Sequence, residues 1–289
     1  ASGVAQFEPL ICATTTYMAV FGLAHLLKMG VDRGLKRGTR PHTFLLEAIT
    51  ALQMCVCVYE NGIIIGNYGL LGFFIAVSLL LIAAGFTNRG FFGNILGHLE
   101  QLIGGGLSIT DFAIILVGQF IGSALALRSA QFLWYQTAFL SASHTKALGA
   151  NLCGFTYHYP LNYVMCFEAL YCMVLRILIG QFMKTTFRRR YLIPVLVSGH
   201  LAASIKFIGV AGLNPMTAYA RLAMCDGLND AHFFYTYWAG AAVGWMFGAH
   251  IQHTFNVWWT GRSKAAKSAA EQKEREARKA AKKNEKKRK

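Results

Sequence analysis

Charged side chains are scarce in this sequence. Asp, Glu, Lys and Arg make up only 14% of its 289 residues, against about 25% in an ordinary soluble domain. Hydrophobic residues reach 55%, and the mean hydropathy is +0.40. The shortage of charge excludes a surface that mostly faces water. We therefore expect a membrane protein whose main partner is the lipid bilayer.

The charges that are present are unevenly placed. Residues 262–289 hold thirteen Lys or Arg against four Glu, which is most of the net charge of +15. A nucleic-acid-binding protein would arrange its basic residues along a folded face. This pattern instead indicates a membrane body with a basic, solvated tail, and we expect no nucleic-acid partner.

Other signatures are missing as well. The seven cysteines include no CxxC pair, and the sequence has no N-x-S/T site. Because the number of cysteines is odd and their spacing is irregular, we predict no disulfide framework. The first apolar run, Leu10–Leu27, lacks the basic start and the cleavage site of a signal peptide.

Long apolar segments are plentiful, and about 20 apolar residues span a bilayer as a helix. Two further stretches, 89–108 and 211–228, are too apolar for exposed loops and too short to cross. We interpret both as re-entrant half-helices, which need protein or a watery cavity around them. The predicted spans are 9–29, 42–60, 68–88, 109–135, 160–183, 191–210 and 231–259.

Basic residues orient these spans. They gather in the linkers 28–40 and 184–190 and in the tail, so the positive-inside rule places these three segments in the cytosol. The six spans from 42 to 259 fit this orientation. The segment 9–29 either crosses as a seventh helix, with Ala1 on the far side, or lies along the interface; we favour crossing.

The six spans form two similar halves. Each half begins with a helix that contains one glutamate, and an Asn-led half-helix follows. Glu47 precedes Asn94 by 47 residues, and Glu168 precedes Asn214 by 46. Three spans in each half require opposite insertion, and inverted repeats with broken helices are typical of transport proteins.

Asn214 and Pro215 suit the start of a helix. Asn is a favoured N-cap and Pro is favoured at the first helical position. A helix that starts inside the membrane points a partial positive charge into a pore. The same dipeptide also begins ordinary surface helices. The apolar segment around it, half a bilayer long, favours the pore.

The stretch GLNPMTAYARLAMC (212–225) resembles the second Asn-Pro-Ala box of aquaporins, with Met216 in place of Ala. The following Met224-Cys225, the Tyr237-Trp238 pair and LLEAITALQMCVCVYE (45–60) are most similar to the intracellular superaquaporin subfamily. NILGHLEQLIGGGLS (94–108) occupies the position of the first box, with Ile95 and Leu96 replacing Pro and Ala. The resemblance covers most of residues 10–259.

This resemblance implies an all-α aquaporin-like inverted repeat of six transmembrane helices and two re-entrant half-helices, with an extra N-terminal membrane helix. It implies a homotetramer and passive flux, no enzyme activity, and no cofactor or metal. The expected segments are the N-terminal helix and linker (1–41), the first repeat (42–140, half-helix 94–104), a loop (141–159), the second repeat (160–260, half-helix 214–226) and the tail (261–289). The implied pore centre consists of Asn94, Ile95, Leu96, Asn214, Pro215 and Met216.

The resemblance also points to a selectivity filter at Phe74, His200, Ala211 and Thr217. Thr217 stands where orthodox aquaporins have arginine, which implies a less cationic and wider constriction. Arg221 lies one helical turn further on. It either projects along the same face or pairs with Glu168 or Asp226. His200 has a competing interpretation as a packed structural histidine.

Glu47 and Glu168 have two interpretations. Ionisable residues inside a membrane are functional candidates, so both could relay protons. The family resemblance implies a structural role instead, in which each accepts hydrogen bonds from the irregular backbone that precedes a half-helix. The symmetrical placement of the two residues favours the structural role.

The tail ends with Lys286 and Lys287 at positions four and three from the end. They resemble an endoplasmic-reticulum retrieval signal, and a polybasic contact with anionic lipid is the alternative. We expect the endoplasmic reticulum or another intracellular membrane, with the plasma membrane as the alternative. The predicted function is a channel for water and small neutral solutes such as glycerol and hydrogen peroxide. The alternatives are a proton-coupled transporter and a largely closed structural or junctional membrane protein.

Overall fold

A computed structural model describes residues 3–91, 93–150, 153, 156–183, 185–223, 225 and 228–258. The chain divides into two units, Ala1–Gly248 and Ala249–Lys289. The described part of the second unit, residues 249–258, is helical, and the predicted retrieval signal at Lys286 and Lys287 lies outside the described residues. The following account concerns the first unit.

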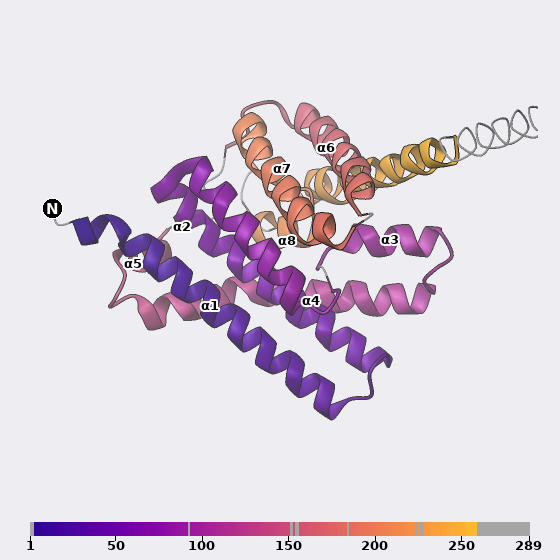
Figure 1. Ribbon diagram of the computed structural model, residues 1–289. Coiled ribbons are helices and arrows are strands. Elements are labelled where there is room, and N and C mark those ends of the chain that lie inside the picture. The colour runs from indigo at the N-terminus through magenta and orange to yellow at the C-terminus, as the bar shows by residue number, and fades with distance from the viewer. Residues whose placement is uncertain are drawn as a thin grey trace, which may run out of the picture. The chain divides into compact units, whose positions relative to one another are not determined.

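The described part of this unit is all-helical (Figure 1). Short π-helical stretches occur at Arg188–Leu192 and Tyr235–Gly240, and residues 241–248 continue as helix. The α-helices are α1 (Gly3–Gly34), α2 (Arg40–Thr87), α3 (Ile95–Ile103), α4 (Ile109–Thr137), α5 (Ala142–Leu148), α6 (Leu161–Phe182), α7 (Ile193–Ile208), α8 (Pro215–Leu222) and α9 (Asp230–Phe234).

The two predicted spans 42–60 and 68–88 both lie in α2. The prediction that 60–67 is a loop is wrong, because the helix continues to Gly69, where φ is 63°. Glycine adopts such a backbone readily, which allows the chain to reverse. Gln53 and Asn88 then lie close enough for both side chains to bond the ammonium group of Lys28, at 2.9 and 2.7 Å. The second arm of α2 therefore folds back along the first.

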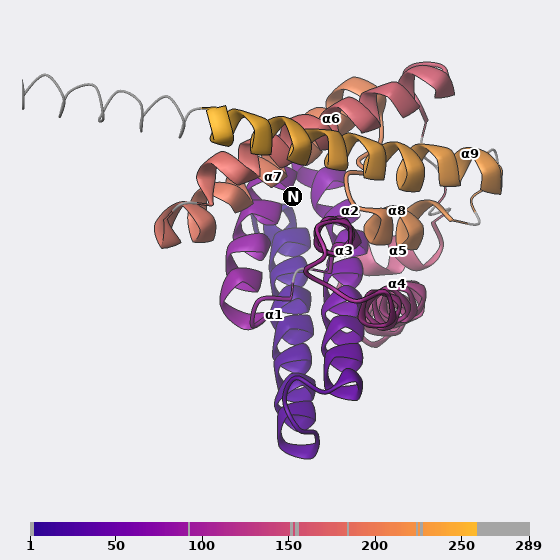
Figure 2. The same cartoon turned by 90° about the vertical axis from the view of Figure 1, so that its right-hand side faces the viewer.

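Helix α1 lies alongside the first arm of α2 in both ribbon views (Figures 1 and 2). Three pairs fix the direction. The amide of Leu10 donates to the hydroxyl of Tyr68 at 3.1 Å, the Tyr17 hydroxyl donates to Asn61 at 2.6 Å, and Lys28 donates to Gln53. The residue numbers rise on α1 while they fall on α2, so the helices are antiparallel. Because α1 contacts the first arm of α2 along its whole length, we favour a helix α1 that crosses the membrane rather than one that lies along the interface.

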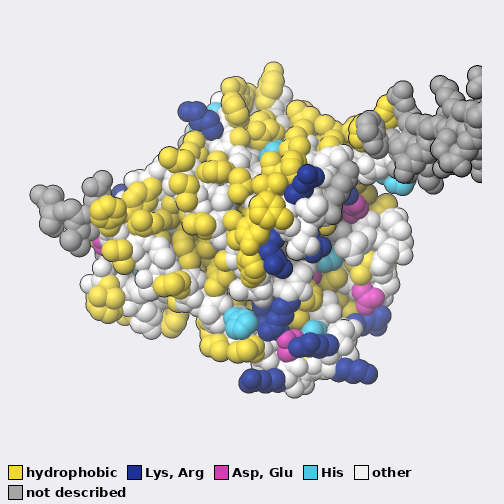
Figure 3. Space-filling view, in the orientation of Figure 1, with side chains coloured by type: hydrophobic (Ala, Val, Ile, Leu, Met, Phe, Trp, Pro, Cys, Tyr) yellow, Lys and Arg dark blue, Asp and Glu magenta, His cyan; other side chains and the backbone are white. Residues whose placement is uncertain are grey.

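Five helices in the described residues are long and apolar enough to cross a membrane: Phe7–Gly34, the two-armed α2, α4, α6 and Arg188–Ile208. Hydrophobic side chains cover the face that carries α1 and α2 (Figure 3). Many Lys and Arg side chains gather at its lower end, where residues 34–40 join these helices (Figures 1 and 3). The predicted membrane fold with an extra N-terminal helix is confirmed.

Each half packs through a pair of glycines spaced four apart. Cβ atoms at Gly118 and Gly122 of α4 would collide with backbone carbonyls of the first arm of α2. Gly244 and Gly248 make the corresponding approach to the backbone of α6. Small residues at this spacing allow membrane helices to pack backbone to backbone. The third helix of each half thus packs on the helix that holds Glu47 or Glu168.

Candidate pore centre

The two half-helices begin in the same way. The side-chain oxygen of Asn94 accepts a hydrogen bond from the amide of Leu96 at 3.0 Å. That of Asn214 accepts from the amide of Met216, also at 3.0 Å. Both asparagines have extended backbones, with φ of −128° and −143°. Each is therefore an N-cap that satisfies an amide with no partner in its own helix.

The two starts also touch each other. The amide nitrogen of Asn214 donates to the carbonyl of Gly93 at 3.0 Å, across 121 residues of sequence. Helices α3 and α8 have nine and eight residues, which corresponds to about 12–14 Å of helix each. The structure thus brings the starts of two short helices together, as the half-helix interpretation requires. Helix α8 ends at Leu222, earlier than the predicted limit at residue 226.

The bulky residues near the caps lie in hydrophobic clusters. Leu96 packs with residues of α6 and with Trp245, all from the second half. Met216 packs with Ile115 of the first half and with Ile95. Leu96 and Met216 are 1% and 0% exposed. Each half-helix therefore inserts a side chain into the opposite half, which ties the two halves together near the pore centre.

Glu168 supports the turn before Asn214. Its carboxylate accepts a hydrogen bond from the amide of Leu213, whose φ of 59° is uncommon for a residue other than glycine. Gly212 lies between Glu168 and Tyr237. The Tyr237 hydroxyl lies 2.9 Å from that of Tyr157. Burial raises the pKa of Tyr157, so this phenol stays protonated at neutral pH and the pair stays hydrogen-bonded.

Glu47 has different partners in the first half. It accepts from the side-chain amide of Gln119 at 2.8 Å, and its other oxygen lies 3.3 Å from the imidazole of His98. His98 is on α3, so Glu47 contacts the half-helix itself rather than the backbone before it. Among the described residues, Thr50 Oγ1, Gln119 Oε1 and His98 Nδ1 are buried without a hydrogen-bond partner, and Glu47 Oε1 has the contact with His98 but no hydrogen bond.

The predicted filter residues come from three regions. Phe74, on the second arm of α2, lies beside Gly199 of α7, where an added Cβ would be 3.8 Å from its ring. Nδ1 of His200 donates to the Leu196 carbonyl at 3.0 Å, and the His200 ring is 5.1 Å from that of Tyr171. Phe74 and His200 therefore belong to neighbouring parts of the fold.

The other two predicted filter residues lie close to the second cap. Ala211 is half-buried and comes three residues before Asn214. The Thr217 hydroxyl donates to the Asn214 carbonyl at 3.1 Å. Within the described part of the chain, no hydrogen bond links Thr217 to His200.

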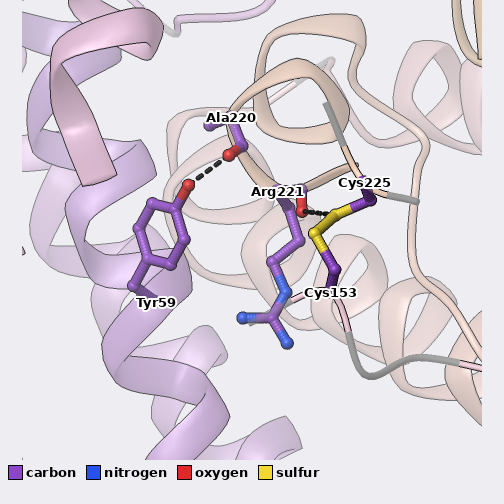
Figure 4. Close-up of a disulfide and its surroundings, with 5 residues drawn as sticks. All are labelled: Tyr59, Cys153, Ala220, Arg221 and Cys225. Atoms are coloured by element: carbon purple, nitrogen blue, oxygen red, sulfur yellow. Dashed lines mark hydrogen bonds between the residues drawn. A yellow bond between two sulfur atoms is a disulfide. The ribbon is translucent and has the colours of Figure 1, made fainter. Parts of the chain in front are cut away.

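Arg221 lies further along α8, and its guanidinium faces α2. An added Cβ on Gly62 would be 3.6 Å from its Nη1. Glu168 is bonded to Leu213 and Cys172 instead, and Asp226 lies outside the described residues. The nearby Tyr59 hydroxyl donates to the Ala220 carbonyl (Figure 4).

A disulfide joins Cys153 to Cys225, 72 residues apart (Figure 4). The prediction of no disulfide framework is wrong in this respect. The disulfide ties the loop between the halves to the chain just after α8. A signal was present, because these two cysteines are the ones outside the predicted spans, and the predicted topology puts both on the side opposite the basic linkers. The free cysteines are Cys12, Cys55, Cys57, Cys166 and Cys172.

Ionisable pairs within the apolar segments were also missed. Arg176 of α6 makes two bonds to Glu100 of α3, at 2.6 and 2.5 Å. Trp245 donates to the same carboxylate at 2.9 Å. In the loop region, His144 lies 3.1 Å from Glu60. Ionisable residues in apolar segments were the available signal.

Known proteins resemble this chain in sequence. No protein-family model matches the chain. A curated Caenorhabditis elegans protein named putative aquaporin-10 is 35% identical over 245 residues, which cover 85% of this chain and 87% of the relative. Aquaporin-11 of Milnesium tardigradum is 23% identical over 240 residues, 82% and 84% of the two chains. The first match and the paired, Asn-capped half-helices agree with the resemblance found in the sequence, and the chain belongs to the aquaporin family.

Proposed function

We propose that this chain is a passive channel for water and small neutral solutes, including glycerol and hydrogen peroxide. The observation that carries the proposal is the contact between Asn214 and Gly93, which joins the starts of two Asn-capped half-helices. A pore that passes between these starts would meet both caps.

The caps supply the chemistry for neutral permeants. A side-chain amide has two N–H donors, and Asn214 uses one of them on Gly93. The second donor is proposed to bind a passing oxygen atom, with Asn94 doing the same from the other half. Helix N-termini carry about half a positive charge each. Two of them at the pore centre disfavour cations while they orient dipolar solutes.

The proposed filter consists of Phe74, His200, Ala211 and Thr217. Thr217, the fourth of these residues, has no cationic group. A solute larger than water therefore meets no guanidinium at this point of the proposed filter. The side chains of Leu96 and Met216 are packed in hydrophobic clusters. Ile95 lies in the same cluster as Met216, so this packing supports a pore centre formed by the two asparagine caps, in which the apolar bulk belongs to the protein core.

We also propose a homotetramer in the endoplasmic-reticulum membrane. The Cys153–Cys225 disulfide supports this location, because disulfides persist in the endoplasmic-reticulum lumen and outside the cell but are rare in the cytosol. The charge distribution places the two cysteines on the non-cytosolic side.

Stopped-flow light scattering on proteoliposomes tests the channel, with water, glycerol and peroxide compared. Thr217→Arg is expected to lower glycerol permeability by about tenfold more than water permeability, because small steric changes in a selective site have effects of this order. Thr217→Val, of similar volume and without charge, is the matched control. Equal losses for water and glycerol would remove Thr217 from the filter. Wild-type protein that conducts no better than empty liposomes would overturn the channel itself.

A proton-coupled transporter is the second candidate, and the contact of the buried Glu47 with the partly exposed His98 favours it. Such a transporter would show saturable flux that follows an imposed pH gradient, and His98→Gln would abolish this dependence. A channel would show flux linear in the solute gradient and indifferent to the pH gradient.

A further inference from the structure

Lys28 is an unusual residue on the N-terminal helix. Its side chain is 1% exposed, although α1 is apolar enough to cross the membrane. Its ammonium group donates to the side-chain oxygens of Gln53 at 2.9 Å and Asn88 at 2.7 Å. A buried charge is costly unless its hydrogen bonds are satisfied. Lys28 therefore needs Gln53 and Asn88 in place, and it holds them together.

Asp32, one turn further along α1, makes the second connection. Its carboxylate pairs with Arg89 and, at 2.9 Å, with His42. Arg89 also donates to the backbone carbonyl of Lys28 at 3.3 Å. The first two residues after α2, Asn88 and Arg89, are thus both bound by α1.

These two residues begin the turn that leads to the first pore asparagine. The turn includes backbone angles that most residues avoid, with φ of 55° at Arg89, 91° at Gly90 and 61° at Gly93. A positive φ is unfavourable for a side chain such as that of Arg89. The turn is held at its start by α1, and at its end the Gly93 carbonyl accepts from Asn214.

The first turn needs this support more than the second does. The second turn has Glu168 on the Leu213 amide and Pro215, whose ring presets φ. In the first turn Ile95 takes the proline position, and Glu47 bonds to side chains instead of backbone. Among the described residues, neither of these two supports has a counterpart in the first turn, and contacts from α1 hold this turn instead.

We propose that Lys28 and Asp32 are positioning residues, through which the N-terminal helix fixes the first pore turn and thereby sets the position of Asn94. The effect on solute selection rests on the proposed channel function. The effect on the turn itself can be measured without any flux.

Hydrogen exchange followed by mass spectrometry tests the turn in the full-length protein. Lys28→Met and Asp32→Asn are expected to speed exchange in residues 89–97 by about tenfold or more, because each change removes hydrogen bonds to a charged group. This segment includes the Leu96 amide, which Asn94 caps. Lys36→Met removes the same charge from an exposed position nearby and should leave exchange unchanged.

Permeability supplies the second readout. Lys28→Met should raise the glycerol-to-water permeability ratio in proteoliposomes, and the change should disappear in an Asn94→Ala background, where no cap remains to be positioned. Asp32→Asn, at a partly exposed site, keeps the test available if Lys28→Met does not fold.

Three results would overturn the proposal. They are unchanged exchange in residues 89–97, equal acceleration in every peptide, and a permeability ratio that responds to Lys28→Met equally with and without Asn94. If the turn loosens as expected while wild-type protein conducts nothing, the positioning role stands and the channel function fails. The two proposals can therefore fail separately.

Discussion

Gly212 shows how closely the second pore turn is fitted. A Cβ at this position would lie 2.5 Å from Glu168 Oε1 and 2.6 Å from a ring carbon of Tyr237. Tyr237 is completely buried, and Glu168 is bonded to the Leu213 amide. Neither neighbour can move without losing the contact that shapes the turn.

Gly212→Ala is therefore expected to displace Glu168, to abolish water permeability and to lower the thermal midpoint in detergent. Overpacking of a close-fitted interior typically costs about 1–3 kcal/mol. Gly66→Ala is the matched control, because an added Cβ there meets nothing within 4 Å. Inside a helix that change should be neutral or slightly stabilising. Equal behaviour of the two variants would contradict the close fit.

For single residues, the sequence predicts the two N-caps better than it predicts which side chains pack around them. Asn94 and Asn214 follow from local rules, since an N-cap bonds two or three residues ahead. The partners of Leu96 and Met216 come from the opposite half of the chain, and no local pattern identifies them. The same is true of His98, which contacts Glu47 only because α3 folds against α2.

Among the elements, the disulfide links the loop between the halves to the end of α8. Residues 72 apart in sequence are joined by it. Cross-linking a long loop restricts the unfolded chain, and removal of a native disulfide costs about 2–4 kcal/mol. Arg221, in the last turn of α8, lies beside this link (Figure 4).

Cys225→Ser is expected to lower the thermal midpoint of the detergent-solubilised protein, and reduction of the wild type should lower it equally. Differential scanning fluorimetry with and without a reductant measures both effects. Cys166→Ser, at an exposed free cysteine, should leave the midpoint and the response to reductant as in the wild type. A wild-type midpoint that does not respond to full reduction would contradict a stabilising role.

The helices also show what the apolar pattern of the sequence predicts and what it does not. It predicts the positions of the spans and the two short helices, because burial in lipid demands apolar length. It misplaces the first reversal, since residues 60–67 contain polar side chains yet remain helical up to Gly69. The chain turns where glycine permits the backbone angle, and hydropathy does not report backbone angles.

For the whole molecule, two independent features indicate one orientation. The basic linkers 28–40 and 184–190 mark the cytosolic side by charge. The Cys153–Cys225 disulfide lies at the opposite ends of the spans and needs an oxidising compartment. Helix α1 extends this orientation to the N-terminus, because it runs antiparallel to the first arm of α2.

Cysteine labelling tests this orientation in vesicles whose cytosolic face is outward. In a background with Cys12 and Cys166 replaced by serine, Lys36→Cys is expected to react with a membrane-impermeant maleimide at once. Phe7→Cys, at an exposed position near the other end of α1, should react only after the vesicles are permeabilised. The reason is the length of α1, 32 residues or about 48 Å, which exceeds the hydrocarbon core. Immediate labelling at both positions would mean that α1 lies along the cytosolic interface, and the seventh crossing would be lost.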